Sequence, residues 1–83
     1  MAFVYILQSE TTGRFYIGST DDLERRISEH LRGHSAATRG RGPWKLVYKE
    51  QLDTVVEARR REYEIKQWKS AKLIQPLVRS SVG

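Results

Sequence analysis

Eighty-three residues suffice for one small domain and leave no room for a second hydrophobic core. Fifteen Lys and Arg residues against ten Asp and Glu residues give a net charge of +5, which favours a polyanionic partner: nucleic acid first, an anionic membrane surface second. The absence of cysteine excludes disulfides and thiolate metal sites, and no apolar run approaches the roughly 20 residues that cross a bilayer. We therefore expect a soluble, cytoplasmic domain that does not bind membranes, monomeric or weakly dimeric.

The N-terminal segment predicts a β-hairpin. Residues 2–7 form an unbroken apolar run, rich in β-branched and aromatic side chains, which is typical of a strand buried on both faces. A polar segment ending in the Thr-Gly pair at 12–13 supplies the turn. Residues 15–17 then resume the strand pattern, which stops at Gly18.

A helix is predicted from about residue 21 to residue 32. Asp21 and Glu24 form a capping-box pattern, and apolar residues recur every four positions at Leu23, Ile27 and Leu31. A helical projection sets Arg26 and His30 one turn apart beside this apolar stripe. Spacing alone leaves two interpretations open: a boundary arginine with a half-buried histidine, or a pair of functional residues.

The second half of the chain predicts one more strand and two more helices. The Gly- and Pro-containing segment 33–43 predicts a loop, and 44–52 has the composition of a strand. A capping box at Thr54 and Glu57 starts a helix expected to reach about Lys69, followed by a short helix over 70–77 and a frayed tail over 79–83. The order β-β-α-β-α-(α) predicts a small α/β (α+β) sheet flanked by helices, with one domain over residues 1–78.

Three polar side chains occupy positions where an apolar residue would fold at lower cost. With Val55 at zero, a projection of the second helix places Glu62 at −20°, inside the arc of its apolar residues. A carboxylate there must be paired with an Arg or Lys of the sheet, protonated, or bound to a hard divalent metal ion. Tyr5 and Tyr16 sit in mid-strand, where tyrosines are commonly core aromatics with the hydroxyl at the rim.

Basic residues are concentrated in one stretch of the chain. Between positions 25 and 49 there are seven basic residues and one acidic residue, Glu29. The glycine-rich loop that carries Arg39 and Arg41 allows close approach of guanidinium groups to phosphates. The Arg59-Arg60-Arg61 triplet has the spread of a solvated helix face. The side chains expected to contact nucleic-acid phosphates are Arg25, Arg39, Arg41, Lys45 and Lys66.

Taken in order along residues 2–70, these features resemble the GIY-YIG nuclease superfamily, most closely its small stand-alone bacterial members. Phe3-Val4-Tyr5 stands at the first signature triplet and Tyr16-Ile17-Gly18 matches the second, with ten residues between the two tyrosines. The resemblance continues through Arg26-Ile27-x-x-His30 and Glu57-Ala58-x-x-x-Glu62-x-x-Ile65-Lys66. Two departures are Phe3 in place of the first glycine and the absence of any asparagine.

The resemblance implies a three-stranded antiparallel sheet flanked by helices, and hydrolysis of DNA phosphodiester bonds with one divalent metal ion, Mg²⁺ or Mn²⁺. It implies that Glu62 ligates the metal, that Arg26 holds the scissile phosphate, and that Tyr5 and Tyr16 orient or activate water. Tyr5 is the expected general base, with His30 assisting proton transfer or positioning a tyrosine.

Three hypotheses for function follow. The leading one is an endonuclease guided by DNA structure rather than sequence, acting in DNA repair or recombination. The second is a non-catalytic nucleic-acid-binding module, and the third is a nuclease subunit that requires a protein partner to supply DNA targeting. RNA is not excluded as the substrate, because phosphate contacts discriminate poorly between the two sugars.

Overall fold

The protein folds around a three-stranded antiparallel sheet. The computed structural model describes residues 1–33, 40, 42–68 and 71–82. Its strands are β1 (Ala2–Ser9), β2 (Phe15–Thr20) and β3 (Trp44–Leu52), in the spatial order β2-β1-β3. This arrangement confirms the predicted hairpin, the predicted third strand and the predicted antiparallel sheet.

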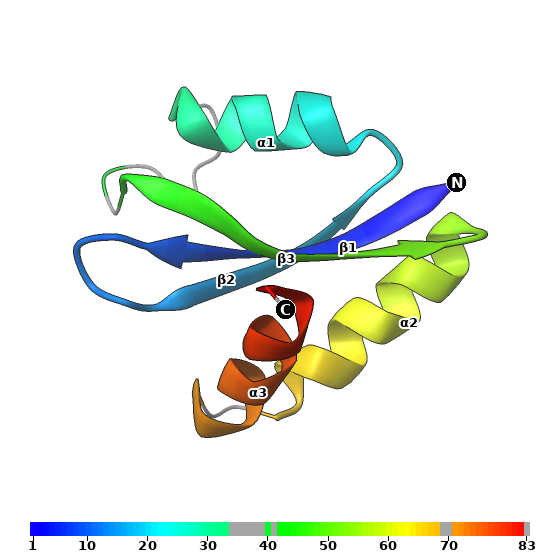
Figure 1. Ribbon diagram of the computed structural model, residues 1–83. Coiled ribbons are helices and arrows are strands. Elements are labelled where there is room, and N and C mark those ends of the chain that lie inside the picture. Colours follow the sequence, from blue (N-terminus) through cyan, green and yellow to red (C-terminus); the bar gives the residue numbers. More distant parts are fainter. Residues whose placement is uncertain (34–39, 41, 69–70, 83) are drawn as a thin grey trace.

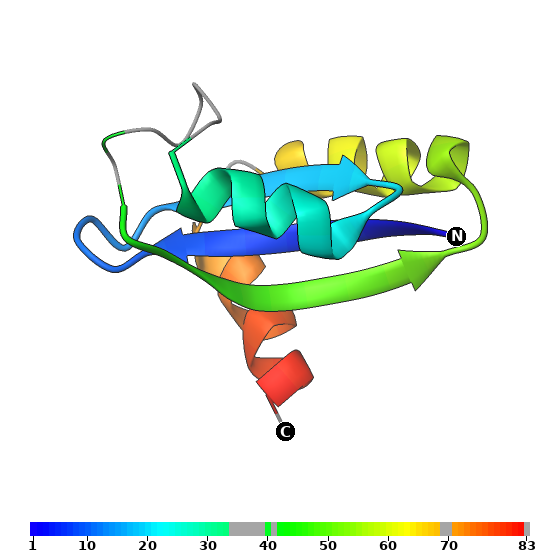
Figure 2. The same cartoon turned by 90° about the horizontal axis from the view of Figure 1, so that it is seen from above.

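Helices cover both faces of the sheet. Helix α1 (Leu23–Leu31) lies on one face, and α2 (Val55–Lys66) and α3 (Ala71–Val82) lie on the other (Figure 1). Seen from above, β2 lies between α1 and α2 (Figure 2). Among the helices that the structure describes, none has the length and apolar character to span a membrane.

Alternation along β1 divides the interior into two apolar clusters. The side chains of successive strand residues point to opposite faces, so the even-numbered and odd-numbered residues of β1 enter different layers. The layer under α2 and α3 contains Ala2, Val4, Ile6, Ile17, Ala58, Ile65 and Ile74. The layer under α1 is built on Tyr5, Leu7 and Trp44, with Tyr16, Leu23 and Ile27 packed against them. The α1 layer therefore contains both tyrosines singled out in the sequence.

The first helix differs from its prediction in two details. Its N-cap is Asp22 rather than Asp21, because Asp22 has the extended backbone of a cap and accepts a hydrogen bond from the Arg25 amide. Leu31 was expected in the buried stripe but is 60% exposed, whereas His30 is 2% exposed. The helix is therefore rotated so that its histidine, and not its last leucine, faces the sheet.

The C-terminal helices also differ in length from their predictions. Thr54 caps α2 as expected, accepting from the Glu57 amide, but the helix ends at Lys66 rather than near residue 69. Helix α3 runs to Val82, through Pro76 and through positions expected to form a tail. Pro76 is the sixth of the twelve residues of α3, beyond the first turn, so it cannot donate an i→i−4 hydrogen bond that another residue would form there.

Candidate active site

Tyr5 occupies the centre of the candidate site and of the sheet. It lies in the middle of β1 opposite Gly18 of β2, with its side chain in the α1 layer, and it is 1% exposed. A Cβ atom at position 18 would lie 2.5 Å from Tyr5 Cζ, closer than packed atoms approach. Glycine at position 18 therefore leaves space for the phenol ring. Strand β2 continues through this residue to Thr20, whereas the sequence pattern predicted that the strand would stop at Gly18.

His30 contacts the Tyr5 hydroxyl directly. Helix α1 places the imidazole over the sheet, where its Nε2 lies 2.8 Å from Tyr5 Oη. Burial, with the nearby Arg26 charge as a second cause, lowers the pKa of His30 below its ordinary value. The imidazole is accordingly neutral at pH 7. In the tautomer that has its hydrogen on Nδ1, Nε2 accepts the hydrogen of the Tyr5 hydroxyl.

Aromatic rings pack around the Tyr5–His30 pair. The Tyr16 ring lies 5.0 Å from the His30 ring and 6.3 Å from the Tyr5 ring, between centroids. Trp44, predicted only as a core residue, packs edge-on against Tyr16 with centroids 6.4 Å apart. Such packing fixes the orientation of the rings around the Tyr5 hydroxyl.

Arg26 supplies the positive charge of the site. Its Nη1 pairs with Glu29 Oε1 at 3.1 Å, an i,i+3 contact on α1. Burial raises the pKa of Tyr5 to about 12, while the Arg26 guanidinium beside the phenol opposes that rise. Tyr5 is therefore neutral at physiological pH, and its proton leaves only if another group accepts it. Glu29 was not predicted as the partner of Arg26, although the i,i+3 spacing indicates it.

Glu62 reaches the same region from the opposite face of the sheet. Its carboxylate lies at the β2 edge, where Oε1 accepts a hydrogen bond from Ser19 Oγ at 2.5 Å and Oε2 pairs with Lys66 Nζ at 2.5 Å. The side chain is 20% exposed, so it is half-buried at an edge rather than enclosed in the core as its helical phase suggested. Its charge is close enough to contribute to the raised pKa of Tyr5.

The two partners of Glu62 come from different elements. Ser19 belongs to β2, 43 residues away along the chain, and was not predicted; its only signal is its place directly after Gly18. Lys66 comes from the same helix, one turn further on, rather than from the sheet. Within the described ranges, no three His, Asp or Glu side chains gather as a metal-ligating group, so Glu62 is a single carboxylate.

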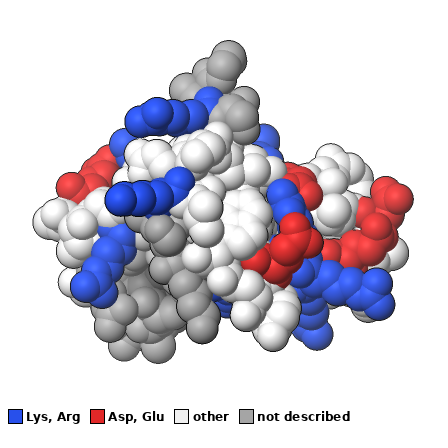
Figure 3. Space-filling model, turned by 90° about the horizontal axis from the view of Figure 1, so that it is seen from below, with Lys and Arg blue, Asp and Glu red and all other residues white. Residues whose placement is uncertain are grey.

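The predicted phosphate-binding residues that the structure describes lie in different parts of the molecule. Arg25 lies next to Arg26 and pairs with Asp21, and Lys66 pairs with Glu62. Lys45 lines a separate groove between β3 and α3, which also contains Val78. Arg39 and Arg41 lie outside the described residues. In Figure 3, the side of the molecule where α2 lies carries intermixed acidic and basic side chains.

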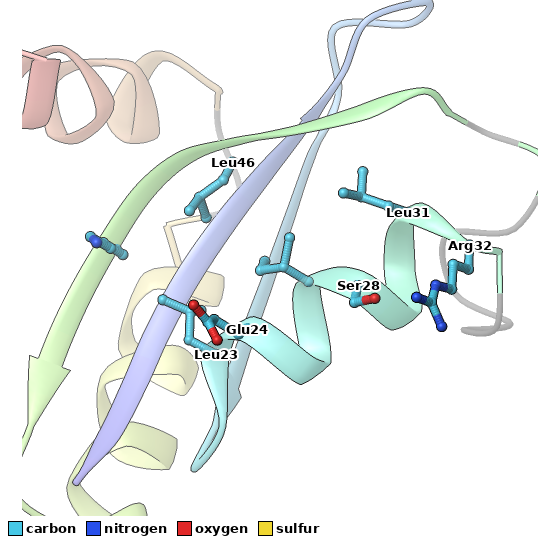
Figure 4. A pocket seen from close by; sticks show the side chains of 8 residues that line it. Leu23, Glu24, Ser28, Leu31, Arg32 and Leu46 are labelled. Carbon is cyan, nitrogen blue, oxygen red and sulfur yellow. The ribbon is translucent and has the colours of Figure 1, made fainter.

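Two of the grooves that adjoin α1 differ in chemistry. One, of about 360 Å³, lies at the end of β2 between α1 and α2 and includes Ser19, Arg25, Arg26 and Arg59. The other, of about 510 Å³, lies between α1 and β3 (Figure 4). Its lining combines four apolar side chains, Leu23, Ile27, Leu31 and Leu46, with Glu24, Ser28, Arg32 and Lys49. The first groove has three arginines and no more than one apolar side chain, so it suits a charged phosphodiester better.

Comparison with known proteins connects this site to a family. A model described as the GIY-YIG catalytic domain matches residues 1–75. A UPF0213 protein of Halobacterium salinarum is 46% identical over 68 residues, 81% of this chain and 87% of that protein. A UPF0213 protein of Clostridium perfringens is 49% identical over 67 residues, 80% of this chain and 71% of that protein. The solution NMR structure of the UPF0213 protein BH0048 from Bacillus halodurans is similar over the whole chain and 88% of its own, with a TM-score of 0.62 and 40% identity.

Proposed function

The chain belongs to the GIY-YIG catalytic-domain family, a family of nucleases, and on this basis we propose that it is a metal-dependent endonuclease that cleaves DNA. The observation that carries the proposal is the buried hydrogen bond between Tyr5 and His30, set beside Arg26. A module that only binds nucleic acid has no use for a buried tyrosine–histidine pair next to a guanidinium. The proposal includes preference for DNA structure over sequence, and a setting in DNA repair or recombination.

Proton transfer in this proposal runs through Tyr5 to His30. A phenol with a pKa of about 12 is not a standing phenolate at pH 7, so Tyr5 cannot act as a base alone. Tyr5 Oη takes a proton from the attacking water as its own proton passes to His30 Nε2, 2.8 Å away. His30 is suited to accept this proton because it is neutral at pH 7.

Stabilisation of the negative charge that develops on the phosphate is assigned to Arg26 and to the cation that Glu62 would hold. Attack on a phosphodiester increases the negative charge on the phosphate oxygens, and the Arg26 guanidinium can donate to two of them. A single carboxylate such as Glu62 fits Mg²⁺ or Mn²⁺, since such ions bind through one or two carboxylates while water and substrate phosphates fill the remaining positions. When bound, such a cation stabilises the developing phosphate charge. Ser19 orients Glu62, and Lys66 would release Oε2.

A cleavage assay with labelled DNA tests this function. The panel comprises linear duplex, nicked duplex, flap, four-way junction and single strand, each with Mg²⁺ or Mn²⁺ and with EDTA. Glu62→Gln should reduce cleavage by about 100-fold or more while DNA affinity stays level or rises, because a metal ligand and a negative charge are removed. The matched control is Glu64→Gln on the same helix, whose carboxylate pairs with Arg61 instead.

Two outcomes would contradict the proposal. Cleavage by Glu62→Gln at the wild-type rate would remove the metal role from this residue. DNA binding by all the variants without cleavage of any substrate would favour the binding module, or a nuclease subunit that requires its partner.

A further inference from the structure

The groove at the end of β2 holds more positive charge than the proposed chemistry uses. It is lined by side chains from three elements: β2, α1 and α2. Three arginines contribute to it, Arg25, Arg26 and Arg59, against two carboxylates, Asp21 and Glu29. Arg26 is assigned to the scissile phosphate, which leaves Arg25 and Arg59 at the same opening without a role in cleavage.

Arg59 is set apart from its two neighbours in the arginine triplet. Arg61 is tied into the fold, pairing with Glu50 and Glu64 and lying 5.8 Å from the Trp68 ring. Arg59 lines the groove, and Arg60 does not. The triplet is therefore not a uniform solvated face, because each arginine has a different environment.

Arg59 has no evident structural duty. No ion pair joins it to an acidic side chain in the described part of the chain. The Arg25–Asp21 pair is also weak, at 3.6 Å with both side chains more than 60% exposed. Both guanidinium groups are thus available to an anion that enters the groove.

The position of Arg59 relative to Glu62 identifies the anion. The two residues are three apart on α2, so they share a face and lie about 4.5 Å apart along the helix axis. Adjacent phosphates of one strand lie close together, since each strand carries one phosphate per about 3.4 Å of duplex axis. A strand whose scissile phosphate lies at Arg26 therefore presents a flanking phosphate to the other two arginines of the same groove, Arg25 and Arg59.

We propose that this groove binds the phosphate flanking the scissile one, and that Arg59 is its principal ligand, with Arg25 as the second. This inference rests on the proposed nuclease function, which assigns the scissile phosphate to Arg26. Its ligand is a backbone phosphodiester of nucleic acid, held by guanidinium hydrogen bonds. Such a contact is independent of base sequence and adds to positioning of the substrate rather than to bond cleavage.

The test compares Arg59→Gln with Arg60→Gln, which makes the same charge change one position away on the same helix. Affinity for a labelled DNA is measured in EDTA, so that no cutting occurs, at several NaCl concentrations. Arg59→Gln should weaken binding by about tenfold and reduce the salt slope by about one. Arg60→Gln should leave the affinity within about twofold of wild type and the salt slope unchanged. Thermal melting of each variant verifies that the fold is intact.

A second probe assigns the contact to one phosphate. Single methylphosphonates, which are uncharged, replace phosphates one at a time on either side of the cut. One flanking substitution should weaken binding of wild type but not of Arg59→Gln. If Arg59→Gln behaves like Arg60→Gln while wild type still cleaves DNA, the groove assignment is wrong and the nuclease function stands. If no substrate is cut but only Arg59→Gln loses affinity and slope, the groove stands as a phosphate site and the nuclease function fails.

Discussion

Tyr5 combines two requirements that normally conflict, burial in the core and participation in proton transfer. Its ring is enclosed by the sheet and α1, and burial disfavours the phenolate. The hydrogen bond to His30 provides an acceptor inside the same enclosure. The pair therefore needs no exposed base, and its reactivity depends on an imidazole that stays neutral.

The raised pKa of Tyr5 has a consequence for stability at high pH. A folded-state pKa of about 12 against an ordinary value of 10 means that the folded protein holds this proton more tightly. The contribution to stability is complete below pH 10 and is lost as the pH rises from 10 to 12, amounting to at most about 2.7 kcal/mol. Chemical denaturation from pH 8 to 12 should show this decline in wild type and a smaller one in Tyr5→Phe. The raised pKa of Tyr48 affects both proteins alike. Parallel curves would contradict the assignment.

Helix α2 contributes to the site through its periodicity. Arg59, Glu62 and Lys66 recur at spacings of three and four, so they follow one face of the helix past the β2 edge. Lys66 holds Glu62 Oε2 by an i,i+4 pair. In the protein without substrate, a lysine ammonium thus occupies one of the two oxygen atoms that a divalent cation would use.

Removing that lysine should therefore strengthen cation binding. We expect Lys66→Met to lower the dissociation constant for Mn²⁺, measured on the protein without DNA, by about two- to tenfold, since it frees Oε2 and removes a nearby positive charge. Lys45→Met, on the other groove, is the control and should leave the constant unchanged. Weaker Mn²⁺ binding in Lys66→Met would show that the lysine supports the metal site instead of competing with it.

The sequence predicted the secondary-structure elements more accurately than it predicted the burial of individual side chains. Strand runs and capping boxes are local patterns, so β3 and the start of α2 were located correctly. The exposure of Leu31 and the burial of His30 depend on how α1 docks on the sheet, which the stripe of α1 does not determine. Glu62 shows the same limit: its helical phase pointed inward, but α2 meets the sheet at an edge, where Ser19 and Lys66 are its polar partners.

The molecule as a whole is small relative to its substrate. Its longest dimension is 31 Å, which corresponds to about nine base pairs of duplex. The cations that the structure gathers around the site are few, and the charges on the α2 side are intermixed (Figure 3). Binding should therefore depend on a short series of phosphate contacts rather than on a broad basic surface.

This size predicts the salt dependence of binding. Four phosphate contacts, by Arg25, Arg26, Arg59 and Lys66, give a slope of log affinity against log salt of about −3.6 on duplex DNA, with roughly one unit more for each of Arg39 and Arg41 that also contacts a phosphate. Fluorescence anisotropy between 50 and 300 mM NaCl (about the usual working range) measures it. Two unrelated DNA sequences should bind equally well. A slope near zero, or strong preference for one sequence, would contradict a phosphate-directed interface.

The placement of Tyr5 in the middle of β1 has one more consequence. In this sheet β1 is the central strand, pairing with β2 on one side and with β3 on the other, so we expect its backbone hydrogen bonds to break last and its amides to exchange most slowly with solvent. The proton-transfer pair is thus attached to the most persistent part of the molecule. Breathing motions at the edges and ends can admit and release a DNA strand while the geometry of the reacting groups stays constant.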